Sequence, residues 1–486
     1  MSADAASAIA ETHASTVVFI GDRAYKIKKP VSLGFLDFST REERERACHA
    51  EVELNRRLAP DVYLGVADVI GPGGAPCDHI VVMRRMPADR RLRTLIQDHR
   101  HVDDEVRAVA RAVAIFHSRA ERSATIATAG MPERLLANWE QSFRQMDPFV
   151  GAVLDRDISR RIEAAARRYI EGRRPLLYSR MDGGEIVDGH GDLMAEDIFC
   201  LDDGPRILDC LDFSDDLRHG DVLADVGFLA MDLERLGRPD LGERFLAWYQ
   251  EFSAERFPAS LAHHYVAYRA HVRAKVACLR HAEGAPGAAD EARLFLDLTD
   301  RHLRLGRVAL FLVGGLPGTG KSTVSAAVGD KLSIPVLRSD EIRKELVGLS
   351  PLTPAAAPYG DGVYDSASTC ATYEVLLRRA REALELGRSV VLDASFTDHR
   401  WRDAAWLVAE ETMSDLIAVR CVAPPDVAAA RLRARHVGTD ASDATPEIAR
   451  RMAAAADPWP EATTVMTVGS PTAAGDEIAA LLDRLP

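Results

Sequence analysis

One stretch of the chain combines glycines, a lysine and hydroxyl groups at a spacing suited to binding phosphate. It matches G-x-x-x-x-G-K-[ST] and reads Gly315-Leu316-Pro317-Gly318-Thr319-Gly320-Lys321-Ser322, followed by Thr323. Glycines let backbone N–H groups curl around a phosphate without a clash from Cβ. Lys321 would reach the β- and γ-phosphates of a nucleotide, and the Ser322 hydroxyl would hold Mg²⁺. We therefore take residues 315–323 as a candidate nucleotide site.

The segments on both sides of this loop fit that interpretation. The apolar run from Val308 to Val313 predicts a parallel strand buried on both faces. The following residues, to Val328, predict a helix whose positive end faces the same anion. A glycine turn joining a strand to a helix is the structural alternative. The octet in this context favours phosphate binding.

Two acidic residues follow the next predicted strands. Asp340 comes after the apolar segment 334–337 and begins a helix, so it is either a reactive carboxylate or a helix N-cap. Asp393 lies in the buried strand 389–395 and is the natural carboxylate to support a metal near the loop. A strand that ends in a polar residue can also simply meet solvent.

A later predicted helix, from Asp426 to His436, carries Arg431, Arg433 and Arg435. In P-loop kinases, an arginine-bearing lid closes over the phosphates and stabilises the transferred charge. Arg431 and Arg435 share a helix face, and we take Arg431 as the candidate catalytic arginine. The alternative is a solvated helix surface.

A second set of charged residues lies near the start of the chain. Lys26 and Lys28 share one face of a predicted strand, and Glu51 lies on a helix that begins after Thr40. Lysines are common on solvated strand edges, and a glutamate on a charged helix is usually solvated. The order of these residues also fits the lysine–glutamate ion pair that positions phosphates in protein-kinase-like folds.

Three aspartates follow at the ends of short predicted strands. Asp192 and Asp197 lie between strands, and Asp212 follows a strand predicted over 206–211. One carboxylate that accepts a hydroxyl proton, with two that bind Mg²⁺, is the minimum set for metal-assisted phosphoryl transfer. Acidic residues in ordinary turns are the alternative.

The motifs around these aspartates resemble the aminoglycoside phosphotransferase-like kinase family. They are His190-Gly191-Asp192, Asp212-Phe213 and Asp225-Val226-Gly227-Phe228. The stretches GDRAYKIKKPVSLGFLDFST and ILDCLDFSDDLRHGDVLADVGFLAMDLE are also similar to bacterial proteins that join such a domain to a P-loop domain.

This resemblance implies a role for each charged residue. Asp192 would be the catalytic base, and Asp212 a metal ligand with Asp209 as the alternative. Lys26 or Lys28 would hold phosphate, and Glu51 would pair with that lysine. Two departures leave a regulatory role open: Asp197 stands where the family has a metal-binding asparagine, and no G-x-G-x-x-G lies in the first hairpin.

The C-terminal part resembles the polynucleotide-kinase, zeta-toxin and gluconate-kinase group. By that resemblance, Asp340 would activate the acceptor. These motifs are specific for the nucleotide, ATP or GTP, and weak for the acceptor.

The full chain of 486 residues is long enough for two or three domains. We expect a bilobal, α+β kinase-like domain over 1–305, with an N-lobe over about 12–86 and a helical C-lobe over about 91–300. An α/β P-loop domain with a parallel sheet follows over 306–486, joined by a linker at Leu303–Arg307.

Composition narrows the class of protein. The formal net charge of −13 argues mildly against a dedicated nucleic-acid binder. The seven cysteines are scattered, and the chain shows neither a secretory signal nor a membrane-spanning run, so we expect a cytoplasmic protein.

The leading hypothesis is an ATP- and Mg²⁺-dependent phosphotransferase that acts on a small hydroxylated acceptor. A nucleotide-regulated sensor with a degenerate N-terminal domain, and a polynucleotide 5′-hydroxyl kinase, are the alternatives. The oligomeric state and any order of action between the domains stay open.

Overall fold

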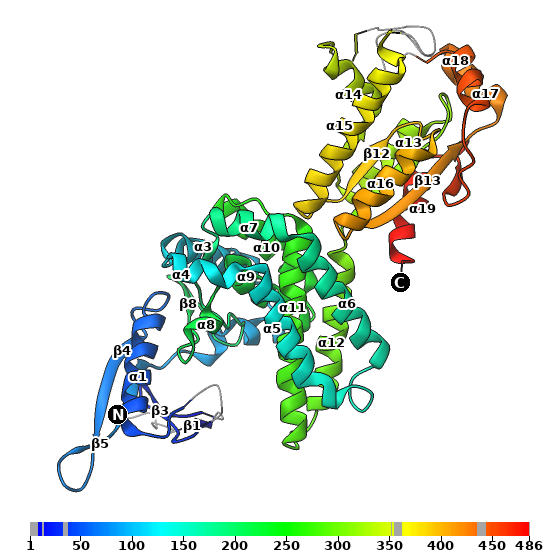
Figure 1. Cartoon of the computed structure of the whole chain (residues 1–486). Helices are drawn as coiled ribbons and strands as arrows, with labels where there is room; N and C mark the ends of the chain where they lie inside the picture. Colours follow the sequence, from blue (N-terminus) through cyan, green and yellow to red (C-terminus); the bar gives the residue numbers. More distant parts are fainter. Residues whose placement is uncertain are drawn as a thin grey trace. The chain divides into compact units, whose positions relative to one another are not determined.

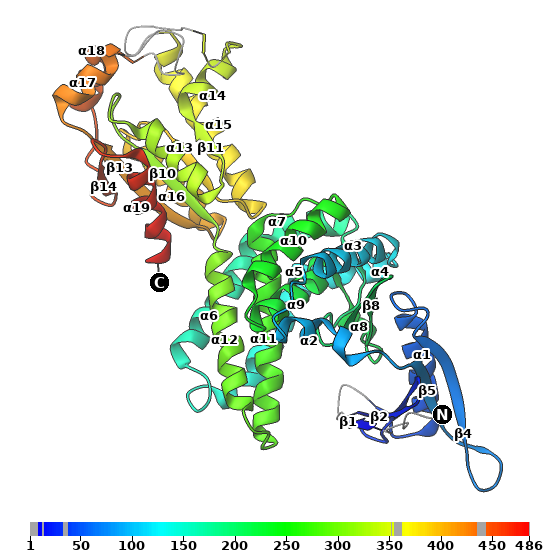
Figure 2. The same cartoon turned by 180° about the vertical axis from the view of Figure 1, so that it is seen from behind.

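The computed structural model describes residues 8–11, 14–32, 37–350, 352–353, 362–434 and 444–485 (Figure 1). Within these ranges the chain forms two compact units. The first comprises Met1–Ile162, Leu177–Phe257 and Ala262–His302, and the second comprises Glu163–Leu176, Pro258–Leu261 and Leu303–Pro486. Figure 2 shows both from the opposite side.

The first unit begins with a five-stranded antiparallel sheet in the order β1-β2-β3-β5-β4. The strands are β1 (Ala8–Glu11), β2 (Ser15–Ile20), β3 (Arg23–Lys28), β4 (Tyr63–Ile70) and β5 (Pro76–Arg84). Helix α1 (Arg41–Asn55) packs on this sheet and begins at Thr40, whose side chain accepts a hydrogen bond from the Glu43 amide. The sequence predicted that a helix begins after Thr40 and that Lys26 and Lys28 lie on a strand, and it missed β1.

The chain from Leu92 to Leu305 is mainly helical. Its helices are α2 (Leu92–Gln97), α3 (Asp103–Arg119), α4 (Ala124–Ala127), α5 (Pro132–Met146), α6 (Arg156–Gly172), α7 (Arg174–Asp182), α8 (Asp215–Arg218), α9 (Val222–Arg235), α10 (Pro239–Ser253), α11 (Ala259–Ala282) and α12 (Ala288–Leu305). Two antiparallel pairs of short strands interrupt them: β6 (Ile186–Asp188) with β9 (His219–Asp221), and β7 (Ile198–Leu201) with β8 (Gly204–Ile207).

The second unit contains a parallel sheet in the order β11-β12-β10-β13-β14. Its strands are β10 (Ala309–Gly314), β11 (Val336–Arg338), β12 (Val390–Asp393), β13 (Asp415–Val422) and β14 (Thr463–Met466). Every residue of β10 is buried, as its apolar sequence predicts for a central strand. The sequence missed β14, which is short and mostly exposed.

Helices flank this sheet. They are α13 (Lys321–Leu332), α14 (Ser339–Leu346), α15 (Ser366–Glu385), α16 (His399–Glu411), α17 (Pro425–Ala434), α18 (Pro446–Ala454) and α19 (Pro471–Asp483). Val324 and Val328 of α13 and Ile478 of α19 share one core with Phe311 and Val313 of β10. Because side chains alternate along a strand, buried Leu310 and Leu312 face the other side.

Helix α12 ends at Leu305, so the candidate linker at Leu303–Arg307 spans the end of this helix. One predicted boundary was wrong. Strand β8 ends at Ile207 and not at residue 211, because its pairing with β7 ends there, which makes Asp209 the first acidic residue after the strand.

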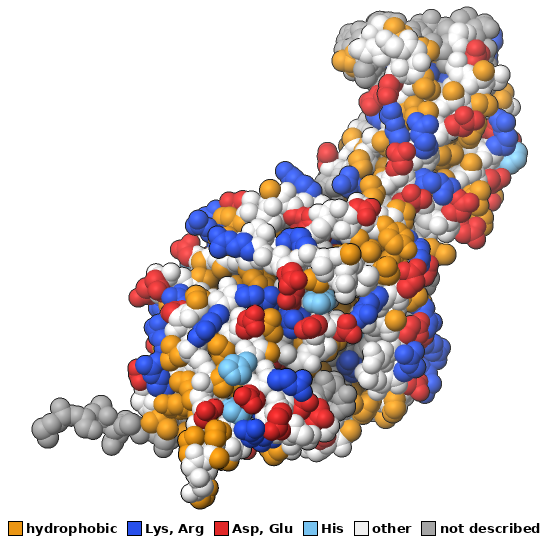
Figure 3. All heavy atoms as spheres, turned by 60° about the vertical axis from the view of Figure 1, so that its left-hand side comes forward, with side chains coloured by type: hydrophobic (Ala, Val, Ile, Leu, Met, Phe, Trp, Pro, Cys, Tyr) orange, Lys and Arg blue, Asp and Glu red, His pale blue; other side chains and the backbone are white. Residues whose placement is uncertain are grey.

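Two further properties concern the apolar character of the helices and the charges on the surface. Among the described helices, none combines the length and the apolar character needed to cross a bilayer. On the face drawn in Figure 3, basic and acidic side chains are interspersed.

Candidate functional sites

The loop after β10 has the backbone shape of a phosphate cradle. Gly315, Gly318 and Gly320 have φ values of 147°, 82° and 86°, in the region that favours glycine. A Cβ on Gly315 would lie 2.6 Å from the carbonyl oxygen of Cys421, and one on Gly318 would lie 2.6 Å from that of Ala428. The cradle is therefore closely packed from behind, and glycine is required at both positions.

The cationic and hydroxyl groups of the motif lie at the open side of this loop. Lys321 is the first residue of α13 and lines a pocket of about 330 Å³, and it forms no ion pair with any described residue. Ser322 is half-buried and Thr323 is exposed in the same first turn. The loop amides, the helix N-terminus and Lys321 together suit a polyphosphate.

Sheet register places Asp393 beside the cradle. Asp393 ends β12 and pairs in register with Val313 of β10 on one side and with Arg338 of β11 on the other. Arg338 Nε donates to Asp393 Oδ2 at 3.2 Å, whereas Oδ1 is buried without a hydrogen-bond partner among the described residues. A buried, unmatched carboxylate oxygen fits a cation such as Mg²⁺.

Asp340 also reaches this edge of the sheet. It is the second residue of α14, whose N-cap is Arg338, so Asp340 is not the helix cap that the sequence left open. Asp340 and Lys321 line the same pocket, together with Arg343, Tyr373 and Trp401. The pocket thus joins the glycine-rich loop to a half-buried carboxylate.

Arg431 contacts the loop from α17. Its guanidinium donates to the Thr467 carbonyl at 2.7 Å and to the Gly318 carbonyl at 3.5 Å, and Thr467 Oγ1 donates to the Thr319 carbonyl. Arg431 therefore braces the cradle from outside. Arg433 is exposed, and Arg435 lies outside the described residues.

In the first unit, Glu51 connects both candidate lysines. Its carboxylate lies 2.8 Å from Lys26 Nζ and 2.9 Å from Lys28 Nζ, and its side chain is 1% exposed. Lys26 also pairs with Asp209 at 2.7 Å, and Lys28 with Asp212 at 2.6 Å. The predicted lysine–glutamate contact is present, and both lysines share it.

The charges of this network stabilise one another. Burial alone would raise the pKa of Glu51, but Lys26 and Lys28 outweigh burial and hold that pKa below its ordinary value. Burial opposes the charge of Lys26 as well, yet Asp209 and Glu51 raise its pKa well above the usual range. Lys26, Lys28, Glu51 and Asp209 therefore favour their charged forms, whereas burial raises the pKa of the fifth member, Asp212.

The His190-Gly191-Asp192 motif is anchored by Asp225 of α9. Asp225 accepts hydrogen bonds from the backbone amides of His190 at 2.6 Å and Gly191 at 2.8 Å, and it contacts His117 Nε2 at 3.2 Å. Asp225, the first residue of the Asp225-Val226-Gly227-Phe228 motif, thus fixes the loop that carries Asp192. His117, which is buried, belongs to this anchor.

Asp192 itself faces a pocket and has a shifted pKa. Burial raises the pKa of the Asp192 carboxyl to about 6, against the attraction of Arg273. A carboxylate with a pKa near 6 remains ionised at neutral pH and accepts a proton more readily than an ordinary aspartate.

Asp209 lies closer to the other acids than the sequence suggested. Burial, together with the charges of Asp209 and Asp192, raises the pKa of Asp197 well above the usual value, whereas Asp212 is not a leading influence on it. Asp209 has φ of 62° and ion-pairs with Lys26. The charge of Asp209 thus acts on both Asp192 and Asp197, whereas Asp212 pairs with Lys28.

Helix α11 contributes basic residues to this pocket, and its sequence alone fits either a solvated face, which is more common, or the lining of a site for an acidic or phosphorylated substrate. The pocket measures about 390 Å³ and includes Asp192, Arg269, Arg273 and Lys275 in its lining. Only the packing of α11 beside the Asp192 loop distinguishes the two readings.

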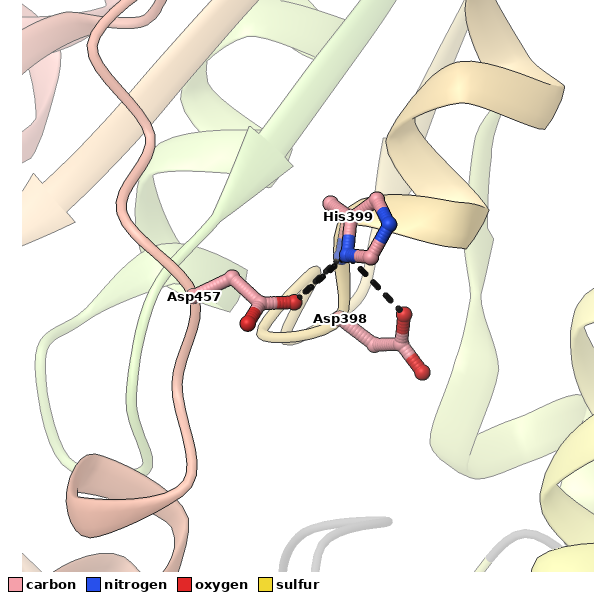
Figure 4. A group of neighbouring side chains, drawn as sticks. All are labelled: Asp398, His399 and Asp457. Atoms are coloured by element: carbon pink, nitrogen blue, oxygen red, sulfur yellow. Dashed lines mark hydrogen bonds and ion pairs between the residues drawn. The ribbon is translucent and has the colours of Figure 1, made fainter.

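A further cluster, of Asp398, His399 and Asp457, contains three possible metal ligands in the second unit (Figure 4). His399 Nδ1 lies 2.9 Å from Asp457 and 3.9 Å from Asp398. Asp398 caps α16 by accepting from the Arg400 amide, and Asp457 accepts from the His399 amide. These bonds account for the cluster as a cap that ties Asp457 to the start of α16.

Comparison with known proteins decides the family. Residues 14–261 match the phosphotransferase enzyme family, and residues 310–459 match an AAA domain. The chain belongs to the phosphotransferase enzyme family. An uncharacterized protein of Mycobacterium tuberculosis strain H37Rv is 42% identical over 95% of this chain and 92% of its own length, and one of Mycobacterium bovis matches equally well.

This phosphotransferase-family chain is also similar to solved structures. A choline/ethanolamine kinase family protein from Mesorhizobium loti covers 62% of this chain and 92% of its own at 15% identity and a TM-score of 0.39. A gluconokinase from Sinorhizobium meliloti covers 36% of this chain and 92% of its own at 18% identity and a TM-score of 0.27. Likeness of this degree says nothing about substrates.

The family matches confirm the two kinds of domain predicted for the chain: a kinase-like domain of the phosphotransferase enzyme family is followed by a P-loop domain. The predicted fold classes are confirmed as well, including the parallel five-stranded sheet. Membership of these families implies that the chain uses a nucleotide.

Proposed function

We propose that the chain is an ATP- and Mg²⁺-dependent phosphotransferase with one phosphoryl-transfer site in each domain, each acting on a small hydroxylated acceptor. The observation that carries this proposal is the glycine cradle with Lys321 at its mouth and the buried, unmatched oxygen of Asp393 at its side. We place the boundary between the domains near residue 305, where α12 ends.

In the P-loop domain, backbone amides of residues 315–320 and the Lys321 ammonium bind the β- and γ-phosphates. Ser322 and Asp393 are the residues that would hold Mg²⁺, which when bound neutralises phosphate charge. Asp340, in the same pocket as Lys321, accepts the proton of the acceptor hydroxyl. Arg431 keeps the cradle in shape from behind.

In the N-terminal domain, Glu51 positions Lys26 and Lys28, and Lys26 binds the nucleotide phosphates. Asp209 and Asp197 are the oxygen donors that would hold Mg²⁺ there, with Asp212 kept in place by Lys28. Asp192 accepts the proton from the acceptor hydroxyl.

The test is Mg·ATP turnover by the full chain in an Asp192→Asn background, which removes the N-terminal base. We expect Lys321→Ala to lower the remaining turnover by about 100-fold or more, because a preorganised cation is lost from the phosphates. Lys331→Ala is the matched control, since Lys331 lies on the same helix and pairs with Asp476 at its surface. Equal turnover in the Lys321 and Lys331 variants would contradict the proposal.

A second candidate function is a regulatory N-terminal domain, favoured by Asp197 at the position where the family has asparagine. Asp192→Asn in the Lys321→Ala background separates the two functions. Phosphoryl transfer that disappears with Asp192→Asn supports catalysis in the N-terminal domain. If no transfer depends on Asp192, although the domain binds nucleotide, the regulatory function is correct.

A further inference from the structure

The pocket beside Asp192 is lined on one side by helix α11. Arg269, Arg273 and Lys275 come from this helix, and Phe213 and Phe228 are among the apolar residues of the lining. All of these residues belong to the first unit, so the pocket is formed within one compact body. Its volume of about 390 Å³ suits a small molecule.

Most acidic groups around this pocket already have partners. Asp221 forms an ion pair with Arg180, and Asp216 pairs with Arg134 at 2.9 Å. Asp225 is occupied by the His190 and Gly191 amides. These carboxylates therefore do not offer their charge to a ligand, which leaves Asp192 as the acid available at the pocket.

The basic side chains of α11 differ from these carboxylates. Neither Arg273 nor Lys275 forms an ion pair with any described residue, and Arg273 Nε is enclosed without a hydrogen-bond partner among them. Burial lowers the pKa of Lys275, and no carboxylate opposes that effect. Arg269 is held in place, because it donates to the Ala224 carbonyl at 2.9 Å and stacks on Phe228.

We infer that the acceptor of the N-terminal domain is a hydroxyl compound that carries an anionic group, a phosphate or a carboxylate, bound by Arg273 and Lys275. This inference rests on the proposed role of Asp192. The acceptor hydroxyl gives its proton to Asp192, its oxygen forms the new bond to the γ-phosphorus of ATP, and the bond from that phosphorus to ADP breaks.

The charges of the side chains that line the pocket explain why we infer an anionic ligand. A half-buried cation without an ion-pair partner carries part of a desolvation cost, and an anionic ligand offsets that cost when it binds. A polycationic aminoglycoside would instead bring like charges together at Arg273 and Lys275, which opposes binding. The apolar walls around Phe213 and Phe228 accommodate a carbon skeleton between the anion and the reacting hydroxyl.

Binding can be measured without turnover. Asp192→Asn full-length protein is titrated by calorimetry with ribose, ribose 5-phosphate, ribonate, glycerol, glycerol 3-phosphate, glycerate and kanamycin. We expect a phosphorylated or carboxylated compound to bind at least about tenfold more tightly than its neutral counterpart, and the better class identifies the anion. If no anionic probe binds more tightly than its neutral counterpart, or kanamycin binds most tightly, the inference is overturned.

Variants of α11 then locate the anion. Arg273→Gln and Lys275→Gln should each weaken binding of the anionic probe by about 10- to 100-fold, because each removes a charge-assisted hydrogen bond. Arg273→Lys should restore part of the loss. Arg280→Gln is the matched control on the same helix, because Arg280 pairs with Glu291 and does not line the pocket. Equal binding by the Arg273, Lys275 and Arg280 variants would overturn the assignment.

Kinetics separate this inference from the proposed function. In the Lys321→Ala background, Arg273→Gln and Lys275→Gln should raise the KM for the anionic acceptor and leave the KM for ATP unchanged. If only the KM for ATP rises, these cations bind the nucleotide, and the inference is overturned. If the pH profile shifts while both KM values stay the same, Arg273 only balances the charge of Asp192, and the inference is overturned as well. Anion binding that depends on Arg273 without any transfer overturns the proposed function alone.

Discussion

In the P-loop unit, the candidate phosphate site is built from the backbone of one loop, whereas in the N-terminal unit the charged groups come from three separate segments. Gly315 and Gly318 make room for amides within six residues of Lys321, and most of the shape is fixed by local backbone. Lys26, Glu51 and Asp209 meet only through β3, α1 and the turn after β8. The first arrangement depends on room for the loop backbone at Gly315 and Gly318, and the second depends on ion pairs among buried side chains.

This difference predicts the largest stability effect at Glu51. Glu51→Gln leaves Lys26 and Lys28 buried without their shared carboxylate, so the N-terminal unit should lose about 3–5 kcal/mol in its free energy of unfolding. Urea unfolding of the full chain measures this loss in the transition of that unit. Glu53→Gln, an exposed residue on the same helix, is the control and should change the midpoint little. Similar midpoints for both variants would contradict the buried network.

The second prediction concerns pH. Because burial raises the pKa of Asp192 to about 6, transfer by the N-terminal domain should fall as pH drops below 6, by about tenfold per pH unit. The sign follows from the role of a base, which must be deprotonated to accept the hydroxyl proton. The rate is measured in the Lys321→Ala background. A rate that stays constant from pH 7 to pH 4.5 would rule out Asp192 as the base.

A third prediction tests the cradle. Gly318→Ala brings a Cβ to 2.6 Å from the Ala428 carbonyl at a φ of 82° and should weaken nucleotide binding to the P-loop domain, at a cost of about 1–3 kcal/mol. Gly348→Ala is the control, because Gly348 has a φ of 73° with open space around its Cβ position. If both substitutions have the same effect, backbone strain and not cradle shape explains it.

The smallest expected effect is at Arg431. Arg431→Ala removes the hydrogen bonds to the Thr467 and Gly318 carbonyls, which should weaken nucleotide binding by about 1 kcal/mol without lowering kcat. Nucleotide titrations and steady-state rates separate the two quantities. A large loss of kcat at unchanged affinity would instead support the predicted role of Arg431 in stabilising the transferred charge.

The same contrast explains how much the sequence could predict. The residues of the P-loop are contiguous, and the parallel strands on both sides of it have continuous apolar runs, so motif and fold were both predictable. The sequence left open the choice between Asp212 and Asp209 as the metal ligand, because where each lies depends on where β8 stops pairing with β7. Likewise, the sequence could not decide whether Arg273 and Lys275 belong to a solvated helix face or line a site, since nothing local shows that α11 packs beside Asp192.

The central claim is that each domain binds its own nucleotide, and calorimetric titration of the full chain with the Mg²⁺ complex of a non-hydrolysable ATP analogue tests it most directly. The account predicts two sites per chain, of which Lys321→Ala removes one and Lys26→Ala removes the other. Two sites that both survive Lys321→Ala, or a wild-type chain that binds no analogue, would contradict it.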